Sequence, residues 1–267
     1  MINHSNPKLS IIIATYNVEQ ILPQALDSII KQKFEDWECI IIDGASKDNT
    51  ISIIQNYITL DSRISYISEV DSGIYDAFNK GWKNAKGEWI YYLGADDVLL
   101  ETGFQELFSK NVNDFDIIYA NVIYRTPAGL NYIKSNKNID DVNYNLQCSH
   151  QGFIMKRSCI KQNNGFNNND YCLCADYDLI LRAYKNHAKM QYININLAIF
   201  DVTGTSGSIN LYKECFLIRK RNVSTNILNN CLIYTKGIII FNLRKIKYTI
   251  INSLTYFQNL FRRLHFN

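Results

Sequence analysis

The sequence WIYYLGADDVL, residues 89–99, joins an uninterrupted apolar run to two adjacent carboxylates. Five apolar residues in a row predict a strand that is buried on both faces, as in a parallel sheet. Asp96 and Asp97 follow where this strand should end, and like charges side by side repel each other. The stretch therefore predicts a central strand and raises the question of what balances the charge behind it.

The residues before this stretch alternate between strand and helix patterns. Apolar runs predict strands, and apolar residues at steps of three and four predict helices. In chain order the predicted elements are strand 9–14, helix 21–33, strand 37–43, helix 48–58, strand 64–68, helix 74–85 and strand 88–93. This alternation predicts an α/β, Rossmann-like domain with a mostly parallel central sheet covered by helices on both faces.

After Val98 the alternation is less regular. The predicted elements are helix 103–110, strand 116–124, strand 153–156, helix 176–185 and strand 190–195, with an Asn-rich stretch over 131–145 and a loop over 203–208. No internal repeat or low-complexity linker divides the chain. We therefore expect one domain over residues 1–210, followed by a helical tail over 211–267.

The composition indicates a folded protein. The 267 residues are 47% hydrophobic and 13% aromatic, enough for a large core. The seven cysteines are odd in number and scattered, so reduced thiols in a cytoplasmic protein are favoured over a disulfide framework or a zinc site. The first residues do not predict a signal peptide, and no run of about 20 apolar residues predicts a membrane-spanning helix.

Charge is divided unevenly along the chain. Residues 211–267 contain ten Lys and Arg and one Glu, a net charge of +9, which leaves 18 basic and 24 acidic residues, or −6, in the rest. From Leu243 onward apolar residues recur at steps of three and four, which predicts an amphipathic helix. We expect peripheral contact with anionic lipid on the inner face of the cell membrane, and packing on the protein's own domain or a second subunit is the alternative. Nucleic acid is not expected as a partner, because the body is acidic.

Polar side chains collect where the first four predicted strands end. In open parallel sheets, ligands bind beyond the carboxyl ends of the strands. The polar residues at these ends are Thr15, Tyr16, Asn17, Asp43, Glu69, Asp71, Asp96 and Asp97. Four neighbouring strand ends thus predict one binding site, and three of them are acidic.

The acidic ends favour a ligand that is held through a cation. Neither G-x-G-x-x-G nor G-x-x-x-x-G-K-[ST] occurs in the chain, so the usual backbone cradles for phosphate are missing. Adjacent carboxylates suit Mg²⁺ or Mn²⁺, which can bridge to phosphate oxygens. The alternative is that Asp96 and Asp97 only form a turn and a helix cap.

Five motifs in the first hundred residues resemble family 2 glycosyltransferases of the GT-A fold. They are ATYN (14–17), IDGASKDNT (42–50), SEVDSGIYDAFNKG (68–81), AKGE (85–88) and ADD (95–97). The third is especially similar to bacterial enzymes that build surface polysaccharides of the colanic acid, O-antigen or capsule type. The resemblance continues more weakly through HQ (150–151), ADYD (175–178) and GTSG (204–207), so it spans roughly residues 8–210.

The resemblance implies a nucleoside-diphosphate sugar as donor and a saccharide or lipid-linked acceptor. The nucleoside pocket would be lined by Thr15, Tyr16, Asp43 and Asp71. Asp43 would accept the base N–H, Asp96 would contact the ribose, and Asp97 would bind Mg²⁺ or Mn²⁺ on the diphosphate. Lys80 would either add positive charge near the nucleotide sugar or pair with Asp76, which lies one helical turn before it.

Asp176 matches the general base of the family. It would take the proton from the acceptor hydroxyl as that oxygen attacks the anomeric carbon, which inverts the configuration. Asp178 is an alternative base, and a capping role is the alternative for Asp176. His150 and Gln151 are candidate contacts with the acceptor or the diphosphate, although a lone His is often structural.

Two positions depart from the family pattern. Gly94 stands where many relatives have Asp or Asn, and Ala175 stands where many have Glu before the catalytic Asp. The second departure leaves open a catalytically inactive subunit that only binds nucleotide sugar. A nucleotidyltransferase is disfavoured, because the chain has no glycine-rich, basic triphosphate loop.

Overall fold

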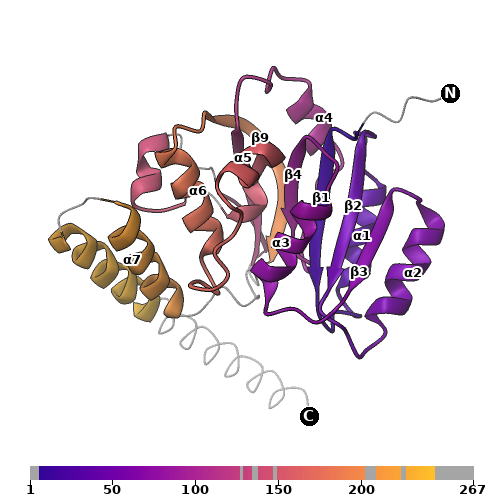
Figure 1. Ribbon diagram of the computed structural model, residues 1–267, viewed down its shortest axis with the longest axis horizontal. Helices are drawn as coiled ribbons and strands as arrows, with labels where there is room; N and C mark the ends of the chain where they lie inside the picture. Colours follow the sequence, from indigo (N-terminus) through magenta and orange to yellow (C-terminus); the bar gives the residue numbers. More distant parts are fainter. Residues whose placement is uncertain are drawn as a thin grey trace, which may run out of the picture. The chain divides into compact units, whose positions relative to one another are not determined.

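A computed structural model describes residues 6–126, 129–133, 138–146, 149–201, 209–223 and 227–243. The chain forms two units, Met1–Gly207 and Ser208–Asn267, and each is described by itself. Within the described residues the first unit contains a nine-stranded sheet in the order β3-β2-β1-β4-β8-β6-β9-β5, with β7 paired to β6 (Figure 1).

The first four strands form the parallel part of this sheet. They are β1 (Leu9–Thr15), β2 (Trp37–Asp43), β3 (Ile64–Ser68) and β4 (Trp89–Leu93). Nearly all residues of β1 and all residues of β4 are buried, as expected for strands covered on both faces. The predicted central strand at Trp89 is therefore confirmed.

The remaining strands make the sheet mixed at its other end. They are β5 (Val98–Leu99), β6 (Ile117–Thr126), β7 (Gly129–Ile133), β8 (Phe153–Lys156) and β9 (Met190–Asp201). Because β8 is antiparallel to both β4 and β6, and β9 is parallel to β6, the strands β6 and β9 run in the same direction as β1–β4. The predicted mostly parallel sheet is confirmed, with β5, β7 and β8 running in the opposite direction.

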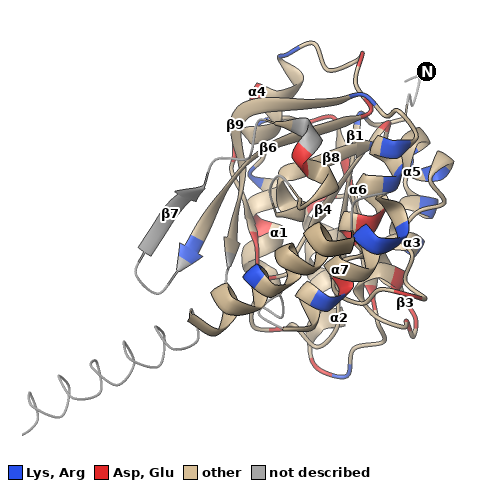
Figure 2. Ribbon diagram, turned by 90° about the vertical axis from the view of Figure 1, so that its left-hand side faces the viewer, with Lys and Arg blue, Asp and Glu red and all other residues tan. Residues whose placement is uncertain are grey.

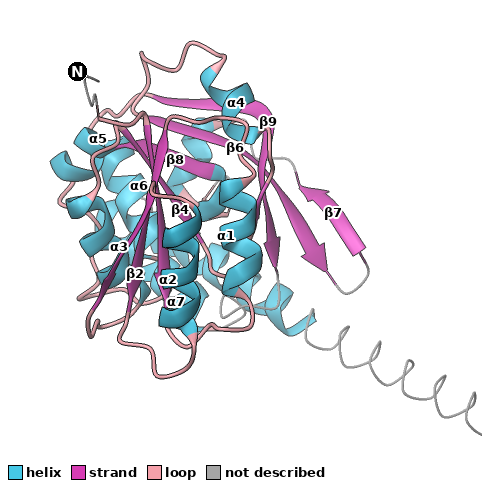
Figure 3. Cartoon of the chain, turned by 90° about the vertical axis from the view of Figure 1, so that its right-hand side faces the viewer, coloured by secondary structure: helices cyan, strands magenta, loops and turns pink. Residues whose placement is uncertain are grey.

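Helices cover both faces of the sheet (Figure 3). The α-helices of the first unit are α1 (Leu22–Ile30), α2 (Thr50–Leu60), α3 (Ile74–Asn84), α4 (Gly103–Phe108), α5 (Arg157–Gln162) and α6 (Ala175–Lys185). Two 3₁₀ turns, η1 (Ile139–Asn143) and η2 (His150–Gly152), precede β8. Helices α1 and α2 lie on one face and α3 on the other, because the chain reverses direction along the sheet between β3 and β4.

The second unit contains α7 (Asn210–Asn222) and a helix over residues 227–243. Nε of Arg219 donates to Oδ1 of Asn230 at 2.8 Å and joins the two helices. Most basic residues of α7, blue in Figure 2, lie in its last turn. The predicted amphipathic helix beyond Leu243 and the predicted loop over 203–208 lie outside the described residues. None of the described helices has the length and hydrophobicity needed to cross a bilayer.

Candidate active site

Asp43, at the end of β2, is the centre of the nucleotide side, which we define as the ends of β1, β2 and β3 and the loops that follow them. Its side chain is fully buried. It accepts hydrogen bonds from the hydroxyls of Thr15 at 3.0 Å and Ser68 at 2.8 Å, and from both the hydroxyl and the N–H of Ser46. A carboxylate has about four acceptor positions, so these donors fill its capacity. A nucleobase N–H at Asp43 would have to share or displace one of them.

The loops after β1 and β2 are joined to each other. Gly44 donates its N–H to the Thr15 carbonyl at 2.8 Å, and Oδ1 of Asn17 accepts the Lys47 N–H at 2.8 Å. Asn17 and Ala45 have φ angles of 52° and 62°, a left-handed conformation that is unfavourable for alanine. Since strain of this kind collects at functional sites, the loop geometry supports a binding role for this edge of the sheet. Between the two loops, Tyr16 is 62% exposed.

Asp71 lies against the Gly44 backbone. A Cβ at Gly44 would be 2.8 Å from Oδ2 of Asp71, so only glycine allows this approach without a shift. Oδ1 of Asp71 accepts the Gly73 N–H at 2.9 Å, just before α3. The structure thus brings together the predicted nucleoside-lining residues Thr15, Asp43 and Asp71, while their contact with a nucleoside stays a prediction.

Lys80 pairs with acidic residues rather than lying free at the site. Its Nζ is 2.9 Å from Glu69 and 3.6 Å from Asp76, and it donates to the Val70 carbonyl at 2.9 Å. Burial alone would lower the pKa of Lys80, but the bond to Glu69 and the charge of Asp76 raise it on balance. The pairing alternative is therefore present in the structure, and Lys80 holds the loop after β3.

Asp97 is buried and faces inward behind β4. Its Oδ2 accepts the Gly94 N–H at 3.1 Å and Nε2 of Gln151 at 2.6 Å. Oε1 of Gln151 is buried and has no hydrogen-bond partner within the described part of the chain. The structure therefore joins two predicted site residues that are 54 positions apart in the sequence.

Gly94 lies against both carboxylates of the turn that follows β4. A Cβ at this position would overlap Oδ2 of Asp97 and lie 2.8 Å from Oδ1 of Asp96. The two carboxylates therefore converge on the Gly94 backbone, where an Asp or Asn side chain has no room without rearrangement. Among the described residues no three His, Cys, Asp or Glu side chains form a metal-binding group, so a cation here would have two carboxylates at most.

Asp176 is at the second position of α6, and its side chain is 16% exposed. Oδ1 accepts the Tyr75 hydroxyl at 3.1 Å and the Tyr177 N–H at 2.8 Å, and Oδ2 is 3.9 Å from Nδ1 of His150. Cys174 occupies the N-cap position and makes no side-chain capping bond there, while Asp176 accepts the Tyr177 N–H in the first turn, so a helix-end role for Asp176 stays open beside its predicted role as base. Burial raises the pKa of Asp176, while His150 and these hydrogen bonds oppose the increase.

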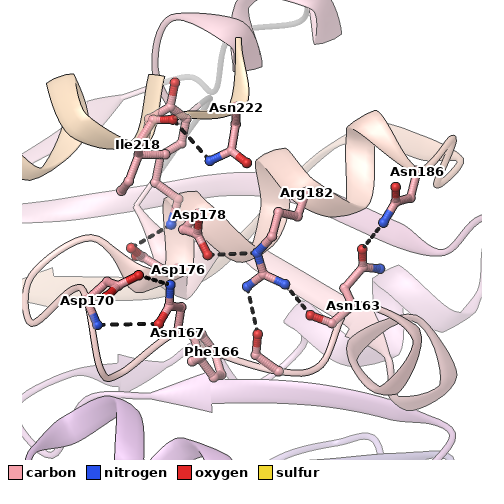
Figure 4. A network of polar contacts seen from close by, with 12 residues as sticks. Asn163, Phe166, Asn167, Asp170, Asp176, Asp178, Arg182, Asn186, Ile218 and Asn222 are labelled. Atoms are coloured by element: carbon pink, nitrogen blue, oxygen red, sulfur yellow. Dashed lines mark hydrogen bonds and ion pairs between the residues drawn. The ribbon is translucent and has the colours of Figure 1, made fainter. Parts of the chain in front are cut away.

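Asp178 has different surroundings, although it is only two residues away (Figure 4). Its Oδ2 is 2.7 Å from Nε of Arg182, one turn later on α6. The same guanidinium donates to the carbonyls of Asn163 and Gly165. Asp178 is buried and serves to hold α6 to the preceding loop, so the geometry favours Asp176 as the residue that can meet an acceptor.

His150 lies close to both Asp176 on α6 and Phe78 on α3. Its ring centroid is 6.2 Å from that of Phe78, and its buried Nε2 has no hydrogen-bond partner among the described residues. We define the base side as η2, the loop over 163–174 and the start of α6. His150 is thus placed at the base side, while its contact with acceptor or diphosphate stays a prediction.

Sequence reasoning missed Tyr75 and Arg182. Tyr75 touches Asp176 across 101 positions, and no local pattern signals such a contact. Arg182 follows Asp178 by four residues, and this spacing on a predicted helix does signal an ion pair.

The comparisons with known proteins agree with this geometry. The sequence profile of the family described as "Glycosyl transferase family 2" matches residues 10–187. The chain belongs to this family. A "PGL/p-HBAD biosynthesis glycosyltransferase" of Mycobacterium bovis is 30% identical to this glycosyltransferase over 227 residues, which are 83% of this chain and 86% of that protein. A Campylobacter jejuni "GalNAc(5)-diNAcBac-PP-undecaprenol beta-1,3-glucosyltransferase" is 31% identical over 57% of this chain and 48% of that protein.

Solved structures confirm the GT-A fold of this glycosyltransferase. TarS 1-349 of S. aureus in complex with UDP-GlcNAc has a TM-score of 0.64 at 17% identity, covering 86% of this chain and 71% of that one. The Pyrobaculum calidifontis mannosyltransferase PcManGT, in complex with GDP-Man and Mn²⁺, has a TM-score of 0.64 at 14% identity, covering 86% and 70%. At these identities the likeness shows the fold alone.

Proposed function

We propose that this glycosyltransferase moves a sugar from a nucleoside-diphosphate sugar to a hydroxyl of a saccharide or lipid-linked acceptor, with inversion, in cell-surface polysaccharide biosynthesis. The observation that carries the proposal is the setting of Asp176: a partly exposed carboxylate whose pKa is raised by burial, held by Tyr75 and a backbone N–H. A raised pKa suits a base that must accept a proton near neutral pH. The Campylobacter jejuni relative, named for an undecaprenol-linked acceptor, and the neighbouring structures with UDP-GlcNAc and GDP-Man support these acceptor and donor classes.

The chemistry assigned to Asp176 is a single displacement. The acceptor oxygen forms a bond to the anomeric carbon while the bond from that carbon to the β-phosphate oxygen breaks. The acceptor's proton passes to Asp176, and the electron pair leaves with the nucleoside diphosphate. Because attack and departure occur on opposite faces of the sugar, the configuration inverts. General-base catalysis of this kind contributes about 10² to 10⁴ in rate.

The residues behind β4 fit a divalent cation. Oxygens of Asp96 and Asp97 converge at Gly94, and in the described part of the chain the buried Oε1 of Gln151 has no hydrogen-bond partner. Hard cations prefer such oxygen ligands. We propose that Asp97 holds Mg²⁺ or Mn²⁺, with Gln151 orienting it through the 2.6 Å hydrogen bond, and that Asp96 beside it contacts the ribose of the nucleotide. When bound, the cation would stabilise negative charge on the leaving diphosphate.

The membrane contact expected for the tail is part of this proposal, because a lipid-linked acceptor lies at the membrane surface. The net charge of +9 over residues 211–267 is its support. The test is sedimentation of the full chain with vesicles containing anionic lipid. Reversing two tail charges, Arg262→Glu with Arg263→Glu, should weaken binding at least about tenfold, at about 1 kcal/mol per basic residue lost. Equal sedimentation of both proteins would instead assign the tail to the protein's own domain or a second subunit.

The catalytic proposal is tested by the release of nucleoside diphosphate from a panel of nucleotide sugars with Mn²⁺. Asp176→Asn should lower release at least about 100-fold while nucleotide affinity, measured by calorimetry, stays within about twofold. Asp97→Asn should instead remove the Mn²⁺ dependence of nucleotide binding. Metal-dependent binding without turnover of any donor would favour the catalytically inactive subunit. An Asp176→Asn protein that keeps full turnover would contradict the proposed base.

A further inference from the structure

Tyr75 connects two parts of the candidate active site that are far apart in the sequence. It lies in the first turn of α3, two residues after Gly73, whose N–H donates to Asp71 at 2.9 Å. Its hydroxyl is 3.1 Å from Oδ1 of Asp176 at the start of α6. The nucleotide side and the proposed base are therefore linked by the first turn of α3 and one hydrogen bond.

The next turn of α3 holds the segment that precedes α6. Nδ2 of Asn79 donates to the Phe166 carbonyl at 2.9 Å, and Oδ1 of Asn79 accepts the Phe166 N–H at 2.9 Å. Asn79 is buried, and Trp82 donates to the same Oδ1 at 2.9 Å. A buried amide that pairs with both backbone groups of one residue fixes the separation of two segments. Tyr75 thus reaches Asp176 from a helix that is already held against the base side.

The Tyr75 hydroxyl has one proton and two acceptors within reach. One is the Leu173 carbonyl at 3.0 Å, and the other is the Asp176 carboxylate at 3.1 Å. A bond to an ionised carboxylate is stronger than one to a neutral carbonyl. The hydroxyl therefore favours the ionised form of Asp176 and keeps its Oδ1 oriented toward α3.

The other titratable groups near Asp176 do not donate a hydrogen bond to its Oδ1, as the Tyr75 hydroxyl does. Among the described residues, the groups around it besides Tyr75 are His150 on η2 and, near the start of α6, Cys174, Asp178 and Arg182. His150 is 3.9 Å from Oδ2, the oxygen that Tyr75 does not contact, and Asp178 is paired with Arg182. Tyr75 is the side-chain donor to Oδ1 in this set.

We propose that Tyr75 is a positioning residue for the base: its hydroxyl orients the Asp176 carboxylate and ties it to the loop that carries Asp71. The inference rests on the proposed role of Asp176. The SGIYDAFNKG segment, residues 72–81, would then help to orient the base that activates the acceptor, and it also borders the nucleotide side.

Tyr92 provides a matched control. Both tyrosine rings pack on Phe78 and Phe166, with centroid separations of 4.5–6.1 Å. The hydroxyl of Tyr92, however, is buried and has no hydrogen-bond partner among the residues that the structure describes. Tyr92→Phe therefore removes the same atom from the same aromatic cluster without touching Asp176.

The first experiment titrates Asp176 directly. The full chain is labelled with ¹³C at aspartate carboxyl carbons, and the Asp176 signal is assigned as the one missing from Asp176→Asn. In Tyr75→Phe its midpoint should move to higher pH by about one unit, a tenfold gain in proton affinity, because the ionised form loses a hydrogen bond. In Tyr92→Phe the midpoint should stay where it is in the unsubstituted protein. Equal midpoints in all three proteins would overturn the proposal without any substrate being needed.

The second experiment measures donor turnover, with water as acceptor, for the nucleotide sugar that gives the fastest release of nucleoside diphosphate. Tyr75→Phe should lower kcat about tenfold, move the acid limb of the pH profile to higher pH, and leave the donor KM unchanged. A change in KM alone would reassign Tyr75 to donor binding. If Asp176→Asn is inactive and Tyr75→Phe behaves like Tyr92→Phe, the inference fails while the proposed function stands. If Asp176→Asn keeps its turnover, the proposed function itself fails.

Discussion

Asp43 on the nucleotide side and Asp176 on the base side are both carboxylates at the candidate active site, but their surroundings are opposite. Asp43 is fully buried and accepts hydrogen bonds from Thr15, Ser46 and Ser68. Asp176 is partly exposed, and among the described residues its hydrogen-bond donors, Tyr75 and Tyr177, both reach Oδ1. Burial raises the pKa of Asp176.

The difference separates two uses of an acidic side chain. On the nucleotide side the carboxylate organises three strand ends, and its donors are supplied by the protein itself. On the base side the carboxylate keeps one oxygen available for a proton, and its raised pKa makes its ionised form less stable in the folded protein. We therefore expect substitutions at Asp43 to affect stability first and substitutions at Asp176 to affect activity first.

The largest expected effect on stability is at Asp43. In Asp43→Asn, the side chain retains one acceptor oxygen and places an NH₂ group against donors that now lack a partner. The free energy of unfolding should fall by about 3–5 kcal/mol, since hydrogen bonds to a buried charge contribute about 1.5–3 kcal/mol each. Urea denaturation measures this, with Ser68→Ala, which removes one of the donors to Asp43, expected to lose about 1.5–3 kcal/mol. A loss below about 1 kcal/mol for Asp43→Asn would show that Asp43 does not organise the nucleotide side.

The next largest effect on stability is expected at Asp178, and it distinguishes this carboxylate from Asp176 on the same helix. Asp178→Asn breaks a buried ion pair with Arg182, so the free energy of unfolding should fall by about 2–3 kcal/mol. The estimate lies below the usual range for broken buried pairs, because Arg182 is partly exposed and keeps two carbonyl acceptors. Residual activity of the folded fraction should keep the unsubstituted pH profile. A changed acid limb in Asp178→Asn would make Asp178 the base in place of Asp176.

The sequence predicts most of the fold, but it does not predict the different surroundings of Asp43 and Asp176. The alternation before Trp89 predicts the parallel strands and their helices, because each element there is local and amphipathic or fully buried. The elements after β4 are less predictable from local patterns. Strand β5 is two residues long, α5 follows β8 directly, and β9 continues to Asp201, past its predicted end. Their pairing depends on contacts between distant segments rather than on local periodicity.

The candidate site shows the same limit. Motif order predicts which carboxylates share one edge of the sheet, because strand ends are local features. It does not predict that Asp43 is saturated by protein donors, nor that Gly94 is the residue that lets Asp96 and Asp97 converge. These properties depend on side-chain directions and on close backbone approaches, which a residue pattern does not encode.

Gly94→Ala should have a smaller effect, concentrated at the cation site. The added Cβ would overlap Oδ2 of Asp97 and press on Asp96, which should cost about 1–3 kcal/mol of stability. Mn²⁺-dependent nucleotide binding should weaken at least about tenfold. Gly44→Ala is the comparison: its Cβ would meet Asp71 on the nucleotide side at 2.8 Å, so it should weaken nucleotide binding equally with and without Mn²⁺. If both variants keep the same Mn²⁺ dependence, the cation does not bind at the Gly94 turn.

The smallest expected effect is the pH dependence of stability at Asp176. The pKa of Asp176 is raised in the folded state above the ordinary value of 3.8. Between these two values the folded state binds more protons than the unfolded state, so this residue makes the protein more stable as pH falls toward 3.8 and less stable as pH rises. Asp176→Asn removes this pH-dependent contribution, so at pH 7 the variant should be as stable as the unsubstituted protein or slightly more stable. Denaturation at pH 7 and at pH 4.5 measures the difference, which should shrink at the lower pH. A variant that is clearly destabilised at pH 7 would place Asp176 with Asp43, as a residue that the fold needs in its ionised form.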